Sequence, residues 1–434
     1  MKKFKAFGLL VVVLALSLAF IACGGGAGGG SGPGDGGGSN TTSGFGGGKG
    51  GGGGGQSGVH EESPYWNAGM IKGQYLTDIN IAFALIDDDD QHTIYIPELR
   101  PLDDGTPMFS NLWQEVAKLK RKFPNLKVNI SVGGWGAENF SDMANDNELR
   151  ELFVAGVCEW LELYDLDGVD IDWEYPVGPE WGSDIIVRPE DADNYISLLQ
   201  DLRDAMDELG GTTGKRYGLT TAVPASDWFM DPDVGNIDVV AVANIVDALK
   251  LMSYDYYGGW SDQTGHLANI YNNPEDPDWG GWSTDQAVEA YLDAGVPPEK
   301  IQMGFAFYGR AFIGVSPGPN GDGLFQEFED VPFVEGEVTR AQIEEFLKPG
   351  SGFTRYWDEV AMAPYLYNGD MWITYSDEQQ IEELVTYSKD KGLGGFFSWE
   401  HGSDMKGTLL KVLYNKAGSG AVVSTYIRTW PLDD

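Results

Sequence analysis

Apolar runs and amphipathic stripes alternate along most of this chain. The apolar runs predict buried strands at residues 75–86, 127–132, 166–176, 217–223, 249–254, 301–307 and 394–399. Stripes of apolar residues at helical spacing predict helices at residues 111–122, 148–163, 190–209, 285–294, 378–391 and 405–414. Strand and helix in regular alternation are typical of a parallel α/β fold.

The seven predicted strands are one short of the eight that close an αβ barrel. The missing strand should precede residue 59, but residues 24–58 are almost entirely Gly and Ser. Another strand pattern stands at the far end of the chain, at residues 421–430. This C-terminal segment is therefore the candidate for the eighth strand.

The alternation breaks between Tyr308 and Tyr375. That stretch is too long for an ordinary connection between a strand and a helix, and it carries short elements of its own. We interpret residues 311–374 as an inserted subdomain within a folded domain that spans residues 59–434.

The first residues have the pattern of an export signal. A basic start precedes an apolar run from Phe7 to Ala22, which is short for a membrane-spanning helix. The run ends at Cys23 in a segment that resembles the cleavage box of bacterial lipoproteins, although Phe20 stands where Leu is usual. We expect residues 1–23 to be a signal peptide with Cys23 as the lipidated residue; an ordinary cleaved signal is the alternative.

Residues 24–58 contain too few apolar side chains to collapse, so we expect them to form a flexible linker. The protein should then be exported and held at the bacterial cell envelope or surface by its lipid anchor, or else secreted.

The formal net charge of −39 argues against nucleic acid and anionic membrane surfaces as partners. A neutral polysaccharide is compatible with it. The chain has 14 Trp and 20 Tyr, whose faces suit sugar rings, although core packing accounts for many of them. Besides Cys23 there is only Cys158, in a helical apolar pattern, so we expect a buried thiol and no disulfide.

Three carboxylates share one face of the predicted strand at residues 166–176. Because side chains alternate along a strand, Asp170, Asp172 and Glu174 point to one side and apolar residues to the other. A solvated edge strand would seldom stack three acids without Lys or Arg. Inside a parallel barrel, at least one of the three should hold a proton near neutral pH, and Glu174 at the rim is the natural donor.

The segment at residues 167–174, Asp-Gly-x-Asp-x-Asp-x-Glu, resembles the signature of the family 18 glycoside hydrolases, the chitinase family. Further segments resemble strand-end motifs of that family, at residues 131–135, 252–255, 304–310 and 394–400. The resemblance covers residues 75–414 and implies a TIM (β/α)8 barrel, with residues 59–434 as its catalytic domain. It also implies a small α+β insertion after strand 7. Residues 357–360 and 364–367 resemble the core of that insertion.

Residues 421–430 resemble the first strand of that family, which runs from Val through Tyr into a Trp. We therefore predict a circular permutation in which the first barrel strand is supplied last. Barrels tolerate this change because their first and last strands are neighbours. The alternatives are a degenerate strand at residues 59–65, or a truncated chain whose tail begins another module.

The position of the second carboxylate bears on the chemistry. A retaining glycosidase with an enzyme nucleophile needs a carboxylate about 5 Å from the acid and across the scissile bond. Asp172 shares a strand with Glu174, roughly 6 to 7 Å along it, and so lies on the same side. A sugar with a 2-acetamido group can instead supply its own carbonyl oxygen, which gives a cyclic oxazolinium intermediate.

The resemblance implies a role for each residue. Glu174 would protonate the leaving oxygen and then activate water, Asp172 would hold the acetamide nitrogen, and Asp170 would share a proton with Asp172. Tyr254 would donate a hydrogen bond to the acetamide carbonyl. Asp167 alternates to the other face of the strand and would be structural. Further substrate-binding residues would be Trp399, Met252, Asp255, Tyr308, Arg310, Trp135 and Trp260.

The expected activity is hydrolysis of β-1,4 linkages in chitin or N-acetylglucosamine oligosaccharides, with retention. The alternatives are an endo-β-N-acetylglucosaminidase on glycoprotein glycans and a non-catalytic sugar-binding protein, against which the intact Glu174 argues. The four His are scattered, so we expect no metal and no cofactor. We also expect a monomer that meets a membrane only through its lipid anchor.

Overall fold

A computed structural model describes residues 65–88, 92–100, 108–178, 185–277 and 282–431. The predicted signal peptide, Cys23, the linker and most of the rival strand at residues 59–65 lie outside these described residues.

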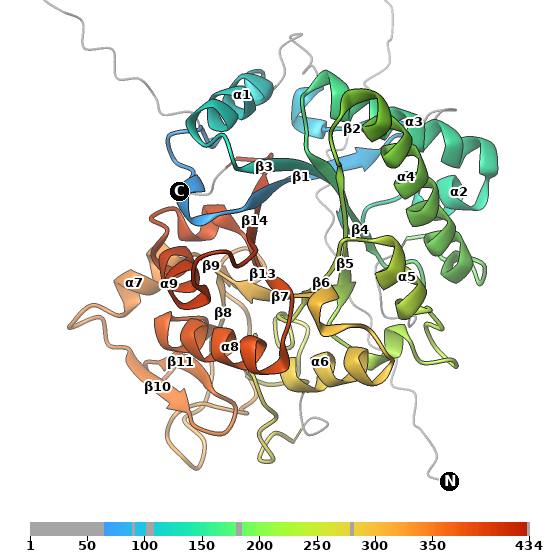
Figure 1. Ribbon diagram of the computed structural model, residues 1–434. Helices are drawn as coiled ribbons and strands as arrows, with labels where there is room; N and C mark the ends of the chain where they lie inside the picture. The colour runs from blue at the N-terminus through green and yellow to red at the C-terminus, as the bar shows by residue number, and fades with distance from the viewer. Residues whose placement is uncertain (1–64, 89–91, 101–107, 179–184, 278–281, 432–434) are drawn as a thin grey trace, which may run out of the picture. The chain divides into compact units, whose positions relative to one another are not determined.

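Parallel strands form a closed ring, as predicted (Figure 1). The eight strands are β1 (Asp78–Ile86), β3 (Lys127–Trp135), β4 (Gly168–Glu174), β5 (Gly218–Pro224), β6 (Ala248–Met252), β7 (Ile301–Ala306), β13 (Gly395–Trp399) and β14 (Val423–Arg428). A short strand, β2 (Ile94–Tyr95), pairs antiparallel with the end of β1.

Helices surround the ring (Figure 1). They are α1 (Leu112–Lys122), α2 (Phe140–Asn145), α3 (Asn147–Leu163), α4 (Asp191–Thr213), α5 (Val239–Ile245), α6 (Thr284–Asp293), α8 (Glu378–Lys391) and α9 (Thr408–Ala417). Single 3-10 turns occur at Gly73–Tyr75, Pro97–Leu99, Asp227–Phe229, Pro298–Lys300 and His401–Asp404. Among the described residues, no helix is both long enough and apolar enough to cross a bilayer.

The C-terminal strand β14 completes the ring. It lies parallel to β1, with Asp78 opposite Ser424, and parallel to β13, with Phe396 opposite Val423. The predicted place of residues 421–430 between these strands is therefore confirmed. That this order arose by circular permutation stays a prediction.

The insertion folds as a second sheet with one helix. Antiparallel strands run in the order β10 (Thr354–Asp358), β11 (Ala363–Tyr367), β12 (Trp372–Tyr375), β8 (Gly309–Phe312) and β9 (Glu337–Val338). Helix α7 (Arg340–Phe346) follows β9 and begins with a capping box formed by Thr339 and Gln342. The sheet starts and ends within two residues of the predicted bounds, 311 and 374.

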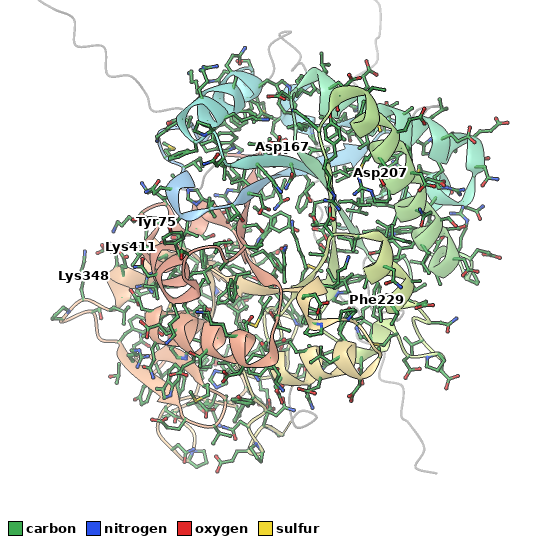
Figure 2. All side chains as sticks on the ribbon, in the orientation of Figure 1. Tyr75, Asp167, Asp207, Phe229, Lys348 and Lys411 are labelled. Carbon is green, nitrogen blue, oxygen red and sulfur yellow. The ribbon has the colours of Figure 1, made fainter. Side chains whose placement is uncertain are left out.

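The two faces of β4 show how the barrel divides its side chains. Val169, Ile171 and Trp173 point outward and are buried against the helices, where the Trp173 ring stacks on Phe140 with centroids 5.1 Å apart. The interior of the ring is filled by side chains rather than open (Figure 2). Many of them are polar, so the inner wall can carry a chemical site.

Several boundaries differ from the sequence-based prediction. Strand β3 continues to Trp135, and β6 ends at Met252, so Tyr254 lies in the loop that follows. Helices α2 and α5 were not predicted; each is only one or two turns long, too short for a clear periodic pattern. Cys158 is a free thiol, half-buried rather than fully buried.

Candidate active site

The acid-bearing face of β4 points into the barrel, as predicted. Asp170 is fully buried and Asp172 is 4% exposed, whereas Glu174 at the end of the strand is only half-buried. Asp167 behaves as a structural residue, since its Oδ2 accepts a hydrogen bond from the Val128 backbone amide at 2.8 Å. The three inward acids therefore form a column that runs from the closed core to the accessible rim.

Asp170 contacts polar side chains from four other strands. Its Oδ2 accepts hydrogen bonds from Ser131 Oγ at 2.8 Å and from Tyr426 OH at 2.7 Å. Its Oδ1 accepts one from Thr220 Oγ1 and lies 3.0 Å from Lys250 Nζ. Burial would raise the pKa of Asp170, but Lys250 and these hydrogen bonds bring it below its usual value.

This environment bears on one expectation. We expected Asp170 to share a proton with Asp172; the lowered pKa of Asp170 and its contacts favour its ionised form, and the shared proton stays a prediction. Sequence reasoning missed its partners because Ser131, Lys250 and Tyr426 come from β3, β6 and β14, far apart in the chain.

Asp172 and Glu174 form the proton-holding pair. Burial, followed by the charges of Glu174 and Asp170, raises the pKa of Asp172 well above its usual value. Burial raises the pKa of Glu174 to about 7, opposed by a hydrogen bond from Tyr175, and the charge of Asp255 raises it further. A side-chain hydrogen bond joins the two carboxyls. The raised pKa of Asp172 favours its protonated form, and Glu174, with a pKa of about 7, is poised between its acid and base forms near neutral pH.

Tyr254 lies within electrostatic reach of this pair. Burial, followed by the charges of Asp172 and Glu174, raises the pKa of its phenol well above the usual value, so the OH remains a hydrogen-bond donor. Its ring packs edge-on against Tyr308, with centroids 6.3 Å apart. Gly304 makes room for it, since a Cβ there would lie 2.8 Å from Tyr254 Cε1.

Half-buried Trp399 belongs to a group of stacked aromatic rings. Its ring stacks on Phe83, with centroids 5.5 Å apart, and Phe83 stacks in turn on Trp430 at 6.3 Å. Met252 packs in the same cluster. Phe83 and Trp430 were not among the predicted substrate-binding residues. The signal that could have found them is their place in the C-terminal half of β1 and just after β14, toward the end of the barrel where sites are built.

Arg310 links three of the predicted residues. Its Nε donates to Asp255 Oδ1 at 2.8 Å, and its guanidinium lies 4.8 Å from the Trp260 ring centroid and 5.5 Å from that of Tyr308. Trp260 is 51% exposed. The structure thus brings these predicted residues into one group that presents an indole to solvent.

Trp135 lies directly beside Glu174. In the register of β3 and β4 it is paired with Glu174, and its side chain is 64% exposed. The glycines before it permit this close pairing, because Gly133 has φ +121° and a Cβ there would lie 2.0 Å from the Asp172 carbonyl oxygen. An exposed indole at this point is available to contact a ligand held at Glu174.

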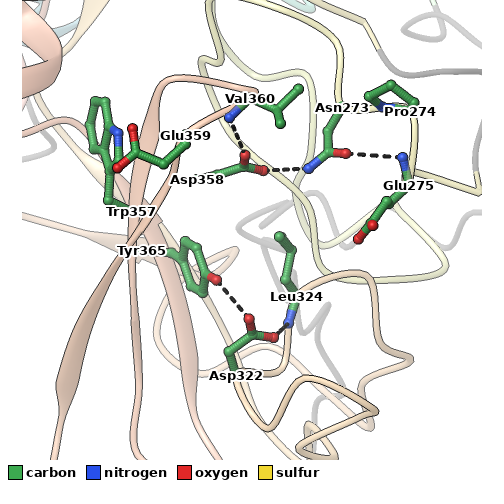
Figure 3. A pocket seen from close by; sticks show the side chains of 10 residues that line it. All are labelled: Asn273, Pro274, Glu275, Asp322, Leu324, Trp357, Asp358, Glu359, Val360 and Tyr365. Atoms are coloured by element: carbon green, nitrogen blue, oxygen red, sulfur yellow. Dashed lines mark hydrogen bonds between the residues drawn. The ribbon is translucent and has the colours of Figure 1, made fainter.

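A separate hollow of about 430 Å³ lies against the insertion (Figure 3). Its wall includes Asp358, which accepts hydrogen bonds from Asn273 and the Val360 amide and pairs with His266 at 3.0 Å. None of the predicted site residues lines it. Its acids hold the wall together, and we assign it no role.

Nothing in the described part of the chain suggests a metal centre. No group of three or more His, Cys, Asp or Glu side chains there is arranged to hold an ion. The acids of β4 are accounted for by Lys250, by hydrogen bonds and by protons.

The fold and the site define a (β/α)8-barrel protein with a carboxylate site at the C-terminal ends of its strands. A sequence model described as "Glycosyl hydrolases family 18" matches residues 55–404. The chain therefore belongs to the glycosyl hydrolases of family 18.

Individual relatives agree with this assignment. Chitinase A1 of Niallia circulans is 36% identical over 352 residues, which cover 76% of this chain and 49% of that protein. Chitinase 1 of Aphanocladium album is 32% identical over 329 residues, 74% of this chain and 72% of that protein. A probable endochitinase of Caenorhabditis elegans is matched over 51% of its length. The chain thus spans about half the length of some of these relatives.

Solved structures give the same picture. A family 18 N-acetylglucosaminidase from Paenibacillus barengoltzii is 34% identical, with a TM-score of 0.68 over 81% of this chain and 95% of that one. A family 18 chitinase from Cycas revoluta, solved in complex with (GlcNAc)3, is 25% identical, with a TM-score of 0.70 over 82% and 96% of the two chains.

Proposed function

We propose that this protein is a chitinase that hydrolyses β-1,4 linkages between N-acetylglucosamine units and retains the anomeric configuration. Its family and the names of its relatives support the reaction class. The observation that carries the proposal is the Asp172–Glu174 pair, which shares protons at the end of β4 beside the phenol of Tyr254.

The arrangement favours a nucleophile from the substrate. Asp172 lies on the same wall of the barrel as Glu174, so it is badly placed to attack the anomeric carbon from the face opposite the leaving oxygen. Its raised pKa also favours the protonated form, which is a poor nucleophile. In the first step the acetamide carbonyl oxygen attacks the anomeric carbon while Glu174 gives its proton to the leaving oxygen. In the second step Glu174 takes a proton from a water molecule. The water oxygen attacks the anomeric carbon and so opens the oxazolinium ring.

The neighbouring residues would serve the same intermediate. Asp172 Oδ1 is buried without a hydrogen-bond partner among the described residues, so it is available to the acetamide N–H. Tyr254 would donate to the acetamide oxygen, and Trp399 would form an apolar floor under the sugar. Trp135 and Trp260 would support the sugars on either side of the bond.

The variant Glu174→Gln tests the proposal. It should abolish hydrolysis of chitin oligomers, a loss of at least about 10³-fold, while oligomer binding by calorimetry is kept, because the amide fills the same space but cannot give up a proton. Glu159→Gln, on the exposed face of α3, is the matched control. Undiminished turnover by Glu174→Gln, or an initially inverted product by NMR, would refute the mechanism.

A second candidate is the release of single N-acetylglucosamine units. It is favoured by the likeness to the Paenibacillus barengoltzii N-acetylglucosaminidase, of which this chain covers 95%. Early products from a chitin hexamer separate the two, since monomer alone indicates the exo activity and mixed oligomers indicate the endo activity.

We also propose that the mature protein is exported and lipid-anchored through Cys23, with residues 24–58 as a tether. The lipobox-like segment supports this. Incorporation of labelled fatty acid by the full-length chain, and its loss in Cys23→Ala, tests it. We further propose that the chain order is a circular permutation, supported by the end of the family match at residue 404, before β14.

A further inference from the structure

The barrel interior holds a buried cation to which the proposed reaction assigns no role. Lys250 on β6 has a side chain that is 1% exposed. Its Nζ lies 3.0 Å from Asp170 Oδ1 and 4.7 Å from the ring centroid of Tyr426. Because an unpaired ammonium is costly to bury, the pair with Asp170 explains how Lys250 is tolerated, but not what it does.

The contacts of Asp170 favour its ionised form. Thr220 donates a hydrogen bond to Oδ1, while Ser131 and Tyr426 donate to Oδ2. Lys250 lies beside Oδ1 as an ion-pair partner, although its Nζ forms no hydrogen bond of normal geometry among the described residues. A proton on Asp170 would therefore have to compete with three hydroxyl donors and a neighbouring positive charge.

We propose that Lys250 is a positioning residue that keeps Asp170 a permanent anion and so confines the acidic proton to Asp172 and Glu174. The proposal deepens the proposed glycosidase function and rests on it. Were Asp170 protonated, it could donate to Asp172 Oδ1, which is buried without a hydrogen-bond partner among the described residues. Asp172 would then be held away from Glu174 and from the acetamide.

The other charges near Lys250 support this assignment. The charge of Lys250 also lowers the pKa values of Asp78 on β1 and Asp172 on β4. Burial raises both pKa values and has the larger effect. Asp78, however, accepts its hydrogen bond from Thr77 at 2.8 Å, and only Asp170 forms an ion pair with Lys250 among the described residues. On the neighbouring strand β7 the residue paired with Lys250 is the uncharged Gln302.

The variant Lys250→Met tests the proposal. Without the cation, burial should raise the pKa of Asp170 into the range in which Glu174 titrates. We expect kcat on chitin oligomers to fall by about tenfold or more. We also expect the acidic limb of the pH profile of kcat/KM to move up by about one pH unit. Infrared spectra of protein with isotope-labelled aspartate should show a new protonated carboxyl near neutral pH.

The conservative variant Lys250→Arg guards against a mere folding defect. It keeps a cation beside Asp170, so it should recover most of the kcat and the wild-type acidic limb. Lys120→Met is the control, because Lys120 pairs with Asp165 and Asp167 outside the barrel and should leave the pH profile unchanged.

Two results would overturn the proposal: a wild-type pH profile with no new protonated carboxyl in Lys250→Met, or a Lys250→Arg variant whose acidic limb is shifted as in Lys250→Met. If the wild-type protein does not hydrolyse chitin oligomers, the proposed function is wrong. The infrared titration would still decide, without any turnover, whether Lys250 holds Asp170 ionised.

Discussion

At the residue scale, neighbouring carboxyls on one strand are given different tasks by their surroundings. Asp170 is surrounded by polar groups that favour its charged form, whereas Asp172 and Glu174 lie two and four residues on, with fewer donors to offset the cost of burial. Two acids with raised pKa values beside a fixed anion can exchange one proton without a change in net charge. That exchange is what a group that acts first as acid and then as base requires.

The pKa of Glu174 predicts the alkaline limb of activity. Because the protonated form is the acid, kcat/KM should fall as the pH rises through about 7. The charge of Asp255 helps to raise this pKa, so Asp255→Asn should lower it and move the alkaline limb down by about half a pH unit. Asp233→Asn, on an exposed loop, is the control. An upward shift in Asp255→Asn would contradict the assignment of Glu174 as the acid.

Gly304→Ala should damage the site more than the fold. The added Cβ would lie 2.7 Å from the Leu251 carbonyl oxygen and 2.8 Å from the Tyr254 ring, so the phenol must move. We expect kcat to fall by about 10- to 100-fold. The stability loss measured by urea unfolding should be about 1–3 kcal/mol.

The matched control is Gly211→Ala in helix α4, where a Cβ would meet open space. It should leave kcat unchanged and raise stability by up to about 1 kcal/mol. Equal activity of the two variants would show that Tyr254 does not need its observed position.

The acid column could be predicted from the sequence, but its electrostatics could not. Period-two alternation alone places Asp170, Asp172 and Glu174 on one face. Tyr426, by contrast, reaches Asp170 across 256 residues, and Lys250 reads in the sequence as one polar residue in an apolar strand. No local sequence pattern specifies these long-range contacts, because they depend on which strands face each other across the closed ring.

At the scale of elements, β14 does two things at once. It closes the ring between β13 and β1, and it carries Tyr426 to Asp170 and Trp430 to the aromatic group beside Trp399. Its place was predictable because one strand was missing from a fold that needs eight. The length of β3 was not, since Gly133 and Gly134 read as a turn but continue the pairing with β4.

Deletion of residues 421–434 should therefore abolish folding and not merely activity. The deletion exposes the edges of β13 and β1 at residues 396–398 and 78–82, which are otherwise paired with β14, and such edges promote aggregation. We expect no cooperative transition in thermal unfolding followed by near-UV circular dichroism. A chain that ends at Pro431 should unfold like the wild type. A cooperative, soluble product of the longer deletion would show that the barrel closes without this strand.

At the scale of the whole molecule, charge is the dominant feature. The chain has 67 acidic and 28 basic residues, so even complete pairing leaves an excess of 39 acids. Most ion pairs among the described residues lie at the surface, where each contributes little. Self-repulsion should thus outweigh these pairs in the folded state.

Salt should accordingly stabilise the protein. Raising the ionic strength from about 0.01 M to about 1 M shortens the Debye length from ~30 Å to ~3 Å, which screens repulsion between distant acids more than it screens a close pair such as Lys250–Asp170. We expect the thermal midpoint to rise by several degrees, measured by circular dichroism against a neutral osmolyte of equal osmolality. Because the proposed substrate is uncharged, kcat/KM for chitin oligomers should change little over the same range. A midpoint that falls with salt would mean that the surface ion pairs outweigh the repulsion.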